Sequence, residues 1–145
     1  PMKIVGHGLD RLEQIFLPKP LLAQIESYCL AERELERCGL IGGRGENAIS
    51  FYPTDNIAED CTLQFLVDPK GQLKAFKTMR AEREELLAIV HSHPTSPARP
   101  SATDLAMAAY PGVAYLIVSL AKESVECGFF VYEQAGFREL PSKII

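Results

Sequence analysis

Two histidines separated by one residue, His91 and His93, are the side chains of this sequence best suited to chemistry. They end an apolar run, residues 86–90, that is typical of a buried strand. Because side chains two apart on a strand point to the same side, both imidazoles can bind one metal ion. Asp104, on the next element of the chain, can add a carboxylate. Three such ligands, with a fourth position open to water, are typical of a catalytic rather than a structural zinc site.

Asp104 also belongs to a pattern that has a purely structural interpretation. Ser101 followed by an acid three positions later resembles a capping box, although the usual acid there is glutamate or glutamine. The two interpretations are compatible, because Ser101 can begin a helix whose first turn carries Asp104 toward the metal. The nearby histidines favour metal binding by Asp104.

A hydrolytic metal site also needs a base, and an acidic run offers three candidates. Glu32, Glu34 and Glu36 lie where a predicted helix gives way to a predicted strand. Their spacing does not separate them, and a solvated charge is the simplest interpretation of each.

The sequence carries these residues in the order and spacing of a known signature. The pattern is Glu36-x-Cys38-Gly39, followed by His91-x-His93-x7-Ser101-x-x-Asp104. It resembles the signature of the JAMM (MPN+) zinc metalloproteases in their compact prokaryotic form, and the resemblance extends over residues 36–120. Cytidine deaminases, by contrast, need a Pro-Cys-x-x-Cys ligand pair that this sequence lacks.

The resemblance implies a role for each residue of the signature. His91, His93 and Asp104 are expected to bind one zinc ion per chain. Glu36 is expected to act as the general base, and Ser101 to stabilise the tetrahedral intermediate. The ligand types favour zinc, although iron or another divalent ion is compatible with the same donors.

The order of elements predicts how these residues are positioned. Strands are expected at residues 13–17, 38–42, 48–52, 63–67, 86–91, 113–120, 125–132 and 137–140, with a hairpin turn at residues 43–45. Helices are expected at residues 18–37, 69–84 and 101–109. This order indicates an α/β protein with a mixed β-sheet flanked by α-helices. The resemblance implies a cytidine deaminase-like fold, which agrees with it.

The composition is ordinary for a soluble globular protein, with 145 residues, 47% hydrophobic and 23% charged, and a net charge of −4. The negative charge argues against nucleic acid as a partner. No apolar stretch approaches the ~20 residues of a membrane span, and the first residues lack the apolar segment of a signal peptide. None of the four cysteines forms a Cys-x-x-Cys pair. We therefore expect a cytoplasmic protein with free thiols and a single domain, residues 1–145.

The resemblance also indicates a substrate class. Eukaryotic deubiquitinating members carry insertions that bind ubiquitin, and residues 55–62 are the only candidate insertion here. The compact form is similar to bacterial and archaeal members that act on small ubiquitin-like or sulfur carrier proteins ending in Gly-Gly. Hydrolysis just after that tail is the expected reaction. A ubiquitin-type lysine isopeptidase and a non-catalytic MPN scaffold are the alternatives, and the sequence is compatible with a monomer or a homodimer.

Overall fold

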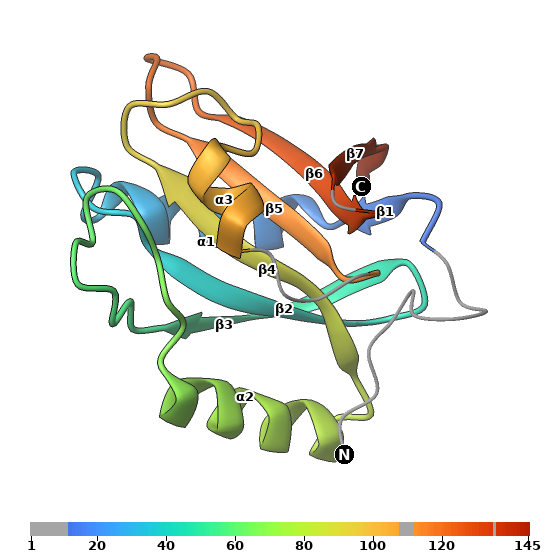
Figure 1. The fold of residues 1–145 in the computed structure, drawn as a ribbon. Helices are drawn as coiled ribbons and strands as arrows, with labels where there is room; N and C mark the ends of the chain where they lie inside the picture. Colours follow the sequence, from blue (N-terminus) through green and yellow to red (C-terminus); the bar gives the residue numbers. More distant parts are fainter. Residues whose placement is uncertain (1–11, 108–111, 135) are drawn as a thin grey trace.

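The computed structural model describes residues 12–107, 112–134 and 136–145 (Figure 1). In chain order the elements are β1 (Ile15–Leu17), α1 (Lys19–Leu30), β2 (Cys38–Arg44), β3 (Asn47–Thr54), α2 (Pro69–Ala81), β4 (Glu85–His93), α3 (Ala102–Met107), β5 (Ala114–Ser119), β6 (Glu126–Glu133), β7 (Gly136–Leu140) and β8 (Ser142–Ile144). None of these helices is long and apolar enough to cross a bilayer.

All eight strands form one mixed sheet in the order β7-β6-β5-β4-β2-β3-β1-β8. β4 runs parallel to β5, and β1 runs parallel to β3 and β8, whereas the other neighbours are antiparallel. Although β7 and β8 lie at the two ends of this order, only Pro141 separates them in the chain. The sheet therefore curls until its two edges meet, and the mixed α/β sheet flanked by helices is confirmed.

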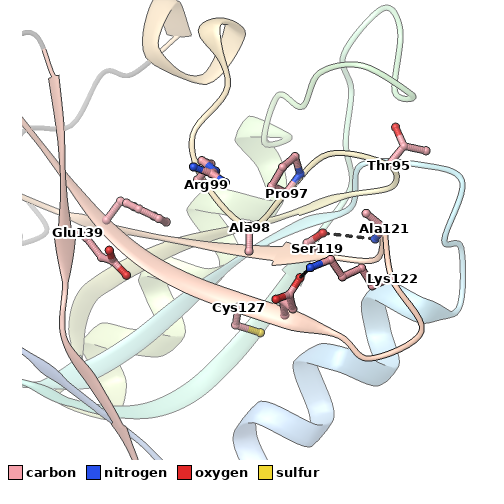
Figure 2. A pocket seen from close by; sticks show the side chains of 11 residues that line it. Thr95, Pro97, Ala98, Arg99, Ser119, Ala121, Lys122, Cys127 and Glu139 are labelled. Carbon is pink, nitrogen blue, oxygen red and sulfur yellow. Dashed lines mark hydrogen bonds and ion pairs between the residues drawn. The ribbon is translucent and has the colours of Figure 1, made fainter.

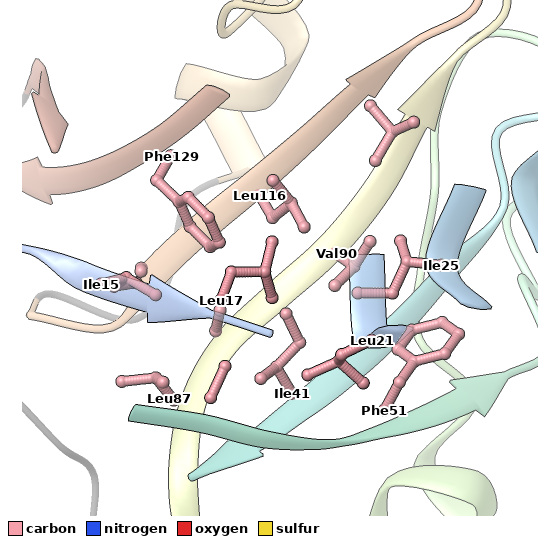
Figure 3. Close-up of a cluster of buried hydrophobic side chains, with 14 of the residues drawn as sticks. Ile15, Leu17, Leu21, Ile25, Ile41, Phe51, Leu87, Val90, Leu116 and Phe129 are labelled. Carbon is pink, nitrogen blue, oxygen red and sulfur yellow. The ribbon is translucent and has the colours of Figure 1, made fainter. Parts of the chain in front are cut away.

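Helices α1 and α2 pack on opposite faces of the sheet, because neighbouring residues of β4 belong to different cores. Val90 packs with Ile25 of α1, whereas Ile89 packs with Met79 of α2. The larger core lies inside the curl, where side chains from α1 and from strands β1 to β7 converge, most of which Figure 3 shows. It contains Ile15, Leu17, Leu21, Ile25, Ile41, Phe51, Leu87, Val90, Leu116 and Phe129.

Local sequence signals account for where the helices begin. Pro20 occupies the first turn of α1, where a missing backbone N–H leaves no hydrogen bond unmade. Asp68 caps α2 by accepting a hydrogen bond from the Lys70 backbone N–H at 3.1 Å, and Pro69 follows in the first turn, as predicted. Helix α1 nevertheless ends at Leu30, so the predicted extension to residue 37 is wrong, and turns occupy residues 31–34.

Two further predictions from the sequence are wrong, and one strand was missed. Residues 63–67 do not form a strand, and only an isolated bridge joins Val67 to Asn56. The hairpin turn lies at residues 45–46 instead of 43–45, because Gly43 and Arg44 still pair with β3. The short edge strand β8 was not predicted. The predicted end of the third helix, residues 108–109, lies outside the described residues.

Gly39, the second residue of β2, is expected to tolerate no side chain. A Cβ atom there would lie 2.6 Å from the Phe51 ring and 2.7 Å from the Tyr52 carbonyl oxygen. Overpacking of this kind typically costs about 1–3 kcal/mol, so Gly39→Ala should lower the free energy of unfolding in urea by that amount.

Gly71→Ala in α2 is the matched control for Gly39→Ala. A Cβ atom at Gly71 would make only ordinary contact, at 3.4 Å from the Thr54 methyl carbon. This second substitution should instead raise the stability by about 0.5–1 kcal/mol, because alanine favours a helix over glycine. Equal effects of the two substitutions would contradict the packing argument.

Candidate metal centre

Three buried side chains, His91, His93 and Asp104, converge where β4 ends and α3 begins. The two Nε2 atoms lie 3.1 Å apart. One carboxylate oxygen of Asp104 lies 3.1 Å from Nε2 of His91, and the other lies 3.0 Å from Nε2 of His93. The histidine side chains are 1% and 2% exposed and the Asp104 side chain is 8% exposed, so these donors have little access to solvent.

The donor set fits a divalent metal ion. Ligands of one tetrahedral zinc ion lie roughly 3.3 Å from one another, given bond lengths of about 2.0–2.1 Å. The separations here, 3.0–3.1 Å, are close to that value. Two imidazole nitrogens and a carboxylate oxygen are also ligands that zinc commonly takes. These three residues could therefore hold such an ion together.

The orientation of His93 is set by the loop that follows β4. Its Nδ1 lies 2.8 Å from the Pro97 carbonyl oxygen. Because a carbonyl can only accept, Nδ1 must carry a proton, and when the ring is neutral Nε2 has the lone pair that a metal ion would take. The loop is itself fixed by the Ser119 hydroxyl, which donates to the Ser96 carbonyl at 2.6 Å. A hydrogen bond from the ring nitrogen that does not bind the metal to a carbonyl oxygen commonly orients a metal-binding histidine.

His91 lies between the cluster and an aromatic side chain. The Phe65 ring stacks on the His91 imidazole with the ring centroids 4.3 Å apart and the planes inclined by 17°. Burial lowers the pKa of His91, although Asp104 opposes the shift, and the neutral ring is therefore favoured. Nδ1 of His91 has no hydrogen-bond partner among the described residues.

The charges of the cluster depend on one another. Burial alone raises the pKa of Asp104, but hydrogen bonds from His91 and His93 outweigh it and hold that pKa well below its ordinary value. Burial alone lowers the pKa of His93, but Asp104, the Pro97 carbonyl and Glu36 raise it overall. Asp104 is therefore an ionised carboxylate at neutral pH, which is the form that binds cations.

Ser101 and Asp104 form the capping box that their spacing predicted. The Ser101 hydroxyl oxygen accepts from the Asp104 backbone N–H at 3.0 Å, and the Ser101 backbone N–H donates to the Asp104 carboxylate at 2.9 Å. This reciprocal pair fixes the carboxylate that faces the histidines, so the capping box is compatible with metal binding by Asp104. Among the described residues no acceptor takes the Ser101 hydroxyl proton, so this proton can be donated to a substrate.

Glu36 is the member of the acidic run that lies at the cluster. Glu32 and Glu34 are exposed, whereas Glu36 is 7% exposed, so the interpretation of Glu36 as a solvated charge is wrong. Burial raises the pKa of Glu36 to about 7, with His93 lowering it and Asp104 raising it further. One carboxylate oxygen, Oε1, has no hydrogen-bond partner among the described residues.

The pairing of β2 with β4 explains why Glu36 lies there. Cys38 pairs with His91 in this antiparallel ladder, so continuing the register places Glu36 opposite His93. The Ser92 backbone N–H donates to the Arg37 carbonyl at 2.9 Å and confirms the continuation. Directly opposite residues project to the same side of a sheet, which directs Glu36 toward the histidines.

Three residues around the cluster were not predicted from the sequence. Phe65 stacks on His91, and the Pro97 carbonyl accepts from His93. Asn56 donates to the Glu36 carbonyl. A loop aromatic and a loop asparagine carry no local signal of such roles. Only the rigid, proline-containing connection after His93 could have indicated that the loop orients that histidine.

A surface pocket of about 590 Å³ lies beside the same loop (Figure 2). Thr95, Pro97, Ala98 and Arg99 form one wall, and residues of β5, β6, β7 and the connection between β5 and β6 form the rest. No residue of the His91–His93–Asp104 cluster lines it. The pocket borders the cluster through the loop whose Pro97 carbonyl orients His93 and through Ser119, which pairs with His93.

Comparisons with known proteins agree with this geometry. Residues 18–130 match the family model of prokaryotic homologs of the JAB domain. A probable TtuB-protein conjugate cleaving protease of Thermus thermophilus is 37% identical over 99 residues, which are 68% of this chain and 64% of that protein. A desampylase of Haloferax volcanii is 30% identical over 101 residues, 68% of this chain and 73% of that protein.

The fold is similar to a solved structure of like size. The solution structure of a protein from Desulfitobacterium hafniense superimposes with a TM-score of 0.82 at 34% sequence identity, over 90% of this chain and 92% of that one. The family match covers most of the chain, including every residue of the cluster and Glu36. The chain therefore belongs to the family of prokaryotic homologs of the JAB domain.

Proposed function

We propose that the protein is a zinc-dependent peptidase or isopeptidase that hydrolyses the bond after the C-terminal Gly-Gly of a small ubiquitin-like or sulfur carrier protein. The observation that carries this proposal is the convergence of His91, His93 and Asp104 with a buried carboxyl group, Glu36, beside them. A scaffold protein has no need to bury four titratable side chains at one place, since such burial is costly unless the groups are used.

His91, His93 and Asp104 would hold the zinc ion, which would supply Lewis acidity that lowers the pKa of a bound water toward roughly 7. Glu36 accepts a proton from the attacking water as the water oxygen bonds to the carbonyl carbon. Ser101 donates its free hydroxyl proton in a hydrogen bond to the developing oxyanion. Glu36 then passes its proton to the amine nitrogen as the C–N bond breaks. No acyl-enzyme forms.

The relatives support the substrate class. One is named for cleaving conjugates between TtuB and proteins, and a second is named desampylase. Both names describe the removal of a small modifier from a conjugate, which is the reaction proposed here. The glycines of a Gly-Gly tail allow a close approach of the backbone to a buried centre.

The direct test uses carrier proteins that end in Gly-Gly and bear either a short C-terminal extension or a lysine-linked peptide. Mass spectrometry should show cleavage after the second glycine, loss of cleavage with a chelator, and recovery when zinc is added. The same carriers with Ala-Ala in place of Gly-Gly are the control and should remain intact. Cleavage that persists in the chelator, or zinc-loaded protein that cleaves none of these carriers, would contradict the proposal.

Cys38, in β2 beside the cluster, is expected to be dispensable for hydrolysis. Burial raises the pKa of its thiol to about 11, so the nucleophilic thiolate is scarce at neutral pH. Its Sγ atom contacts the Thr54 hydroxyl at 3.4 Å, as a packing residue would. Cys38→Ala, measured by the carrier assay, should retain kcat near the wild-type value. Complete loss of hydrolysis in a folded, zinc-loaded variant would contradict the water mechanism.

A further inference from the structure

The loop between β3 and α2, residues 55–68, is held together and tied to Glu36 by one side chain. Nδ2 of Asn56 donates to the Glu36 carbonyl oxygen at 2.7 Å and to the Gln64 carbonyl oxygen at 3.0 Å. Oδ1 of Asn56 accepts from the backbone N–H of Ala58 at 2.9 Å and from that of Leu66 at 3.0 Å. Both ends of the amide are therefore used, and only asparagine offers this combination in so short a side chain.

The same loop also binds the backbone N–H of Glu36, on the other side of its Cα atom. The Glu36 backbone N–H donates to the Cys61 carbonyl oxygen at 2.7 Å. Glu36 lies in neither a helix nor a strand, so no regular ladder satisfies its buried backbone groups. The loop supplies the partners instead, one from Asn56 and one from Cys61.

The Glu36–Arg37 peptide, whose carbonyl accepts from Asn56, is also held from the opposite direction by Ser92, the residue between the two histidines. The Arg37 backbone N–H donates to the Ser92 hydroxyl oxygen at 2.9 Å, and the Ser92 backbone N–H donates to the Arg37 carbonyl at 2.9 Å. Strand β4 therefore fixes residue 37, and the loop fixes residue 36. The direction of the Glu36 side chain depends on both attachments.

We propose that Asn56 is a positioning residue that sets the Glu36 carboxylate relative to His91, His93 and Asp104. This inference rests on the proposed function, in which Glu36 is the general base. A misplacement of about 1 Å can reduce an enzymatic rate about 10²-fold. Loss of the Asn56 contact should therefore lower kcat far more than it weakens substrate binding.

Asn56→Asp removes the contact with Glu36 and keeps the acceptor half of the side chain. The variant keeps an oxygen that can accept from Ala58 and Leu66 but loses both donations, to Glu36 and to Gln64. We expect kcat for a Gly-Gly carrier to fall by about 10–100-fold, with KM and zinc affinity unchanged. Asn56→Ala removes the side-chain amide without adding a charge and keeps the test decisive if the aspartate variant does not fold.

Asp60→Ala is the matched control within the same loop. It also removes two hydrogen bonds, from the Thr62 backbone N–H and the Thr62 hydroxyl to the Asp60 carboxylate, and neither involves Glu36. A general loosening of the loop would affect both variants alike. We expect Asp60→Ala to keep the wild-type kcat.

Hydrogen exchange of the Glu36 backbone amide provides a readout that does not depend on activity. In zinc-free protein, Asn56→Asp or Asn56→Ala should accelerate exchange at Glu36 by about tenfold, because the loop that Asn56 holds together carries the Cys61 carbonyl that accepts from the Glu36 amide. Asp60→Ala should leave this rate unchanged. Thermal unfolding of each variant shows whether exchange has changed only locally.

The outcomes separate the two proposals. If Glu36→Gln is inactive, but the Asn56 variants match Asp60→Ala in kcat and in Glu36 exchange, Asn56 has no positioning role and the proposed function stands. A loss confined to KM or to zinc affinity would overturn the positioning role as well. If Glu36→Gln keeps the wild-type rate, the proposed role of Glu36 fails whatever the Asn56 variants do.

Discussion

Replacing Glu36 by glutamine is expected to lower kcat by about 10²–10⁴-fold, the usual contribution of a general base, while zinc remains bound. Glutamine has nearly the same size and leaves the backbone contacts of residue 36 in place, but it cannot accept the proton of the attacking water. None of the three clustered ligand atoms belongs to Glu36. The measurement is kcat for a Gly-Gly carrier, together with the zinc content of the purified variant.

Glu34→Gln is the matched control, because it makes the same chemical change at an exposed position of the same acidic run. It should leave both kcat and zinc content unchanged. A Glu36→Gln variant with wild-type turnover would remove Glu36 from the mechanism. Loss of zinc from the Glu36→Gln variant would instead indicate that Glu36 is a metal ligand.

Stability provides a separate check on the Glu36→Gln variant. Because burial raises the pKa of Glu36 from 4.5 to about 7, ionising this group in the folded, zinc-free protein costs free energy. The contribution of Glu36 to stability therefore decreases as pH increases from 4.5 toward 7. Glutamine carries no charge, so zinc-free Glu36→Gln should be at least as stable as the wild type near pH 8, and a loss of activity would not reflect unfolding.

The convergence of His91, His93 and Asp104 was predictable from the sequence because their positions depend on local regularities. His91 and His93 face one side through the two-residue period of a strand. Asp104 lies in the first turn of a helix that Ser101 caps, and a capping box is a local pattern. The starts of α1 and α2 were predictable for the same reason, since Pro20 and Asp68 act on their own first turns.

Glu36 could not be distinguished from Glu32 and Glu34 by local rules, because its position depends on pairing across the sheet. The register that aligns β2 with β4 joins residues about fifty positions apart, such as Cys38 and His91. The resemblance to a known family supplied that choice, and the burial of Glu36 alone among the three agrees with it.

The errors in the fold also involve contacts that are distant in sequence. Residues 63–67 have the composition of a strand, but Asn56 binds the backbone of Gln64 and Leu66 and satisfies it without a ladder. Strand β8 is short and exposed, and it forms because the curled sheet brings it beside β1. Neither the role of Asn56 nor the pairing of β8 with β1 can be inferred from the residues of these segments alone.

His91→Ala is expected to abolish both hydrolysis and the stabilisation of the fold by zinc. An ion that binds only the folded state stabilises it by about 2.7 kcal/mol when its concentration is one hundred times Kd. For a domain of this size such a change raises Tm by roughly 5–10 °C. The wild type should show this increase when zinc is added after chelation, whereas His91→Ala, which lacks one of three ligands, should not.

Asp104→Ala should lose zinc in the same way but should also be less stable without metal. Its carboxylate accepts from the Ser101 backbone N–H, and losing such a cap typically costs about 0.5–2 kcal/mol. His91→Ala leaves the capping box intact, so the difference between the two zinc-free variants measures the structural role of Asp104 separately from its metal-binding role.

Cys61→Ala serves as the control for the ligand set, because this partly exposed thiol belongs to the loop that contacts Glu36 and zinc binds thiolates well. It should keep the zinc-dependent increase in Tm and the activity of the wild type. Loss of that increase in Cys61→Ala, together with full zinc occupancy in His91→Ala, would show that the metal does not bind at the end of β4. An increase that disappears in His91→Ala and Asp104→Ala and persists in Cys61→Ala is the pattern that a site of two imidazoles and one carboxylate requires.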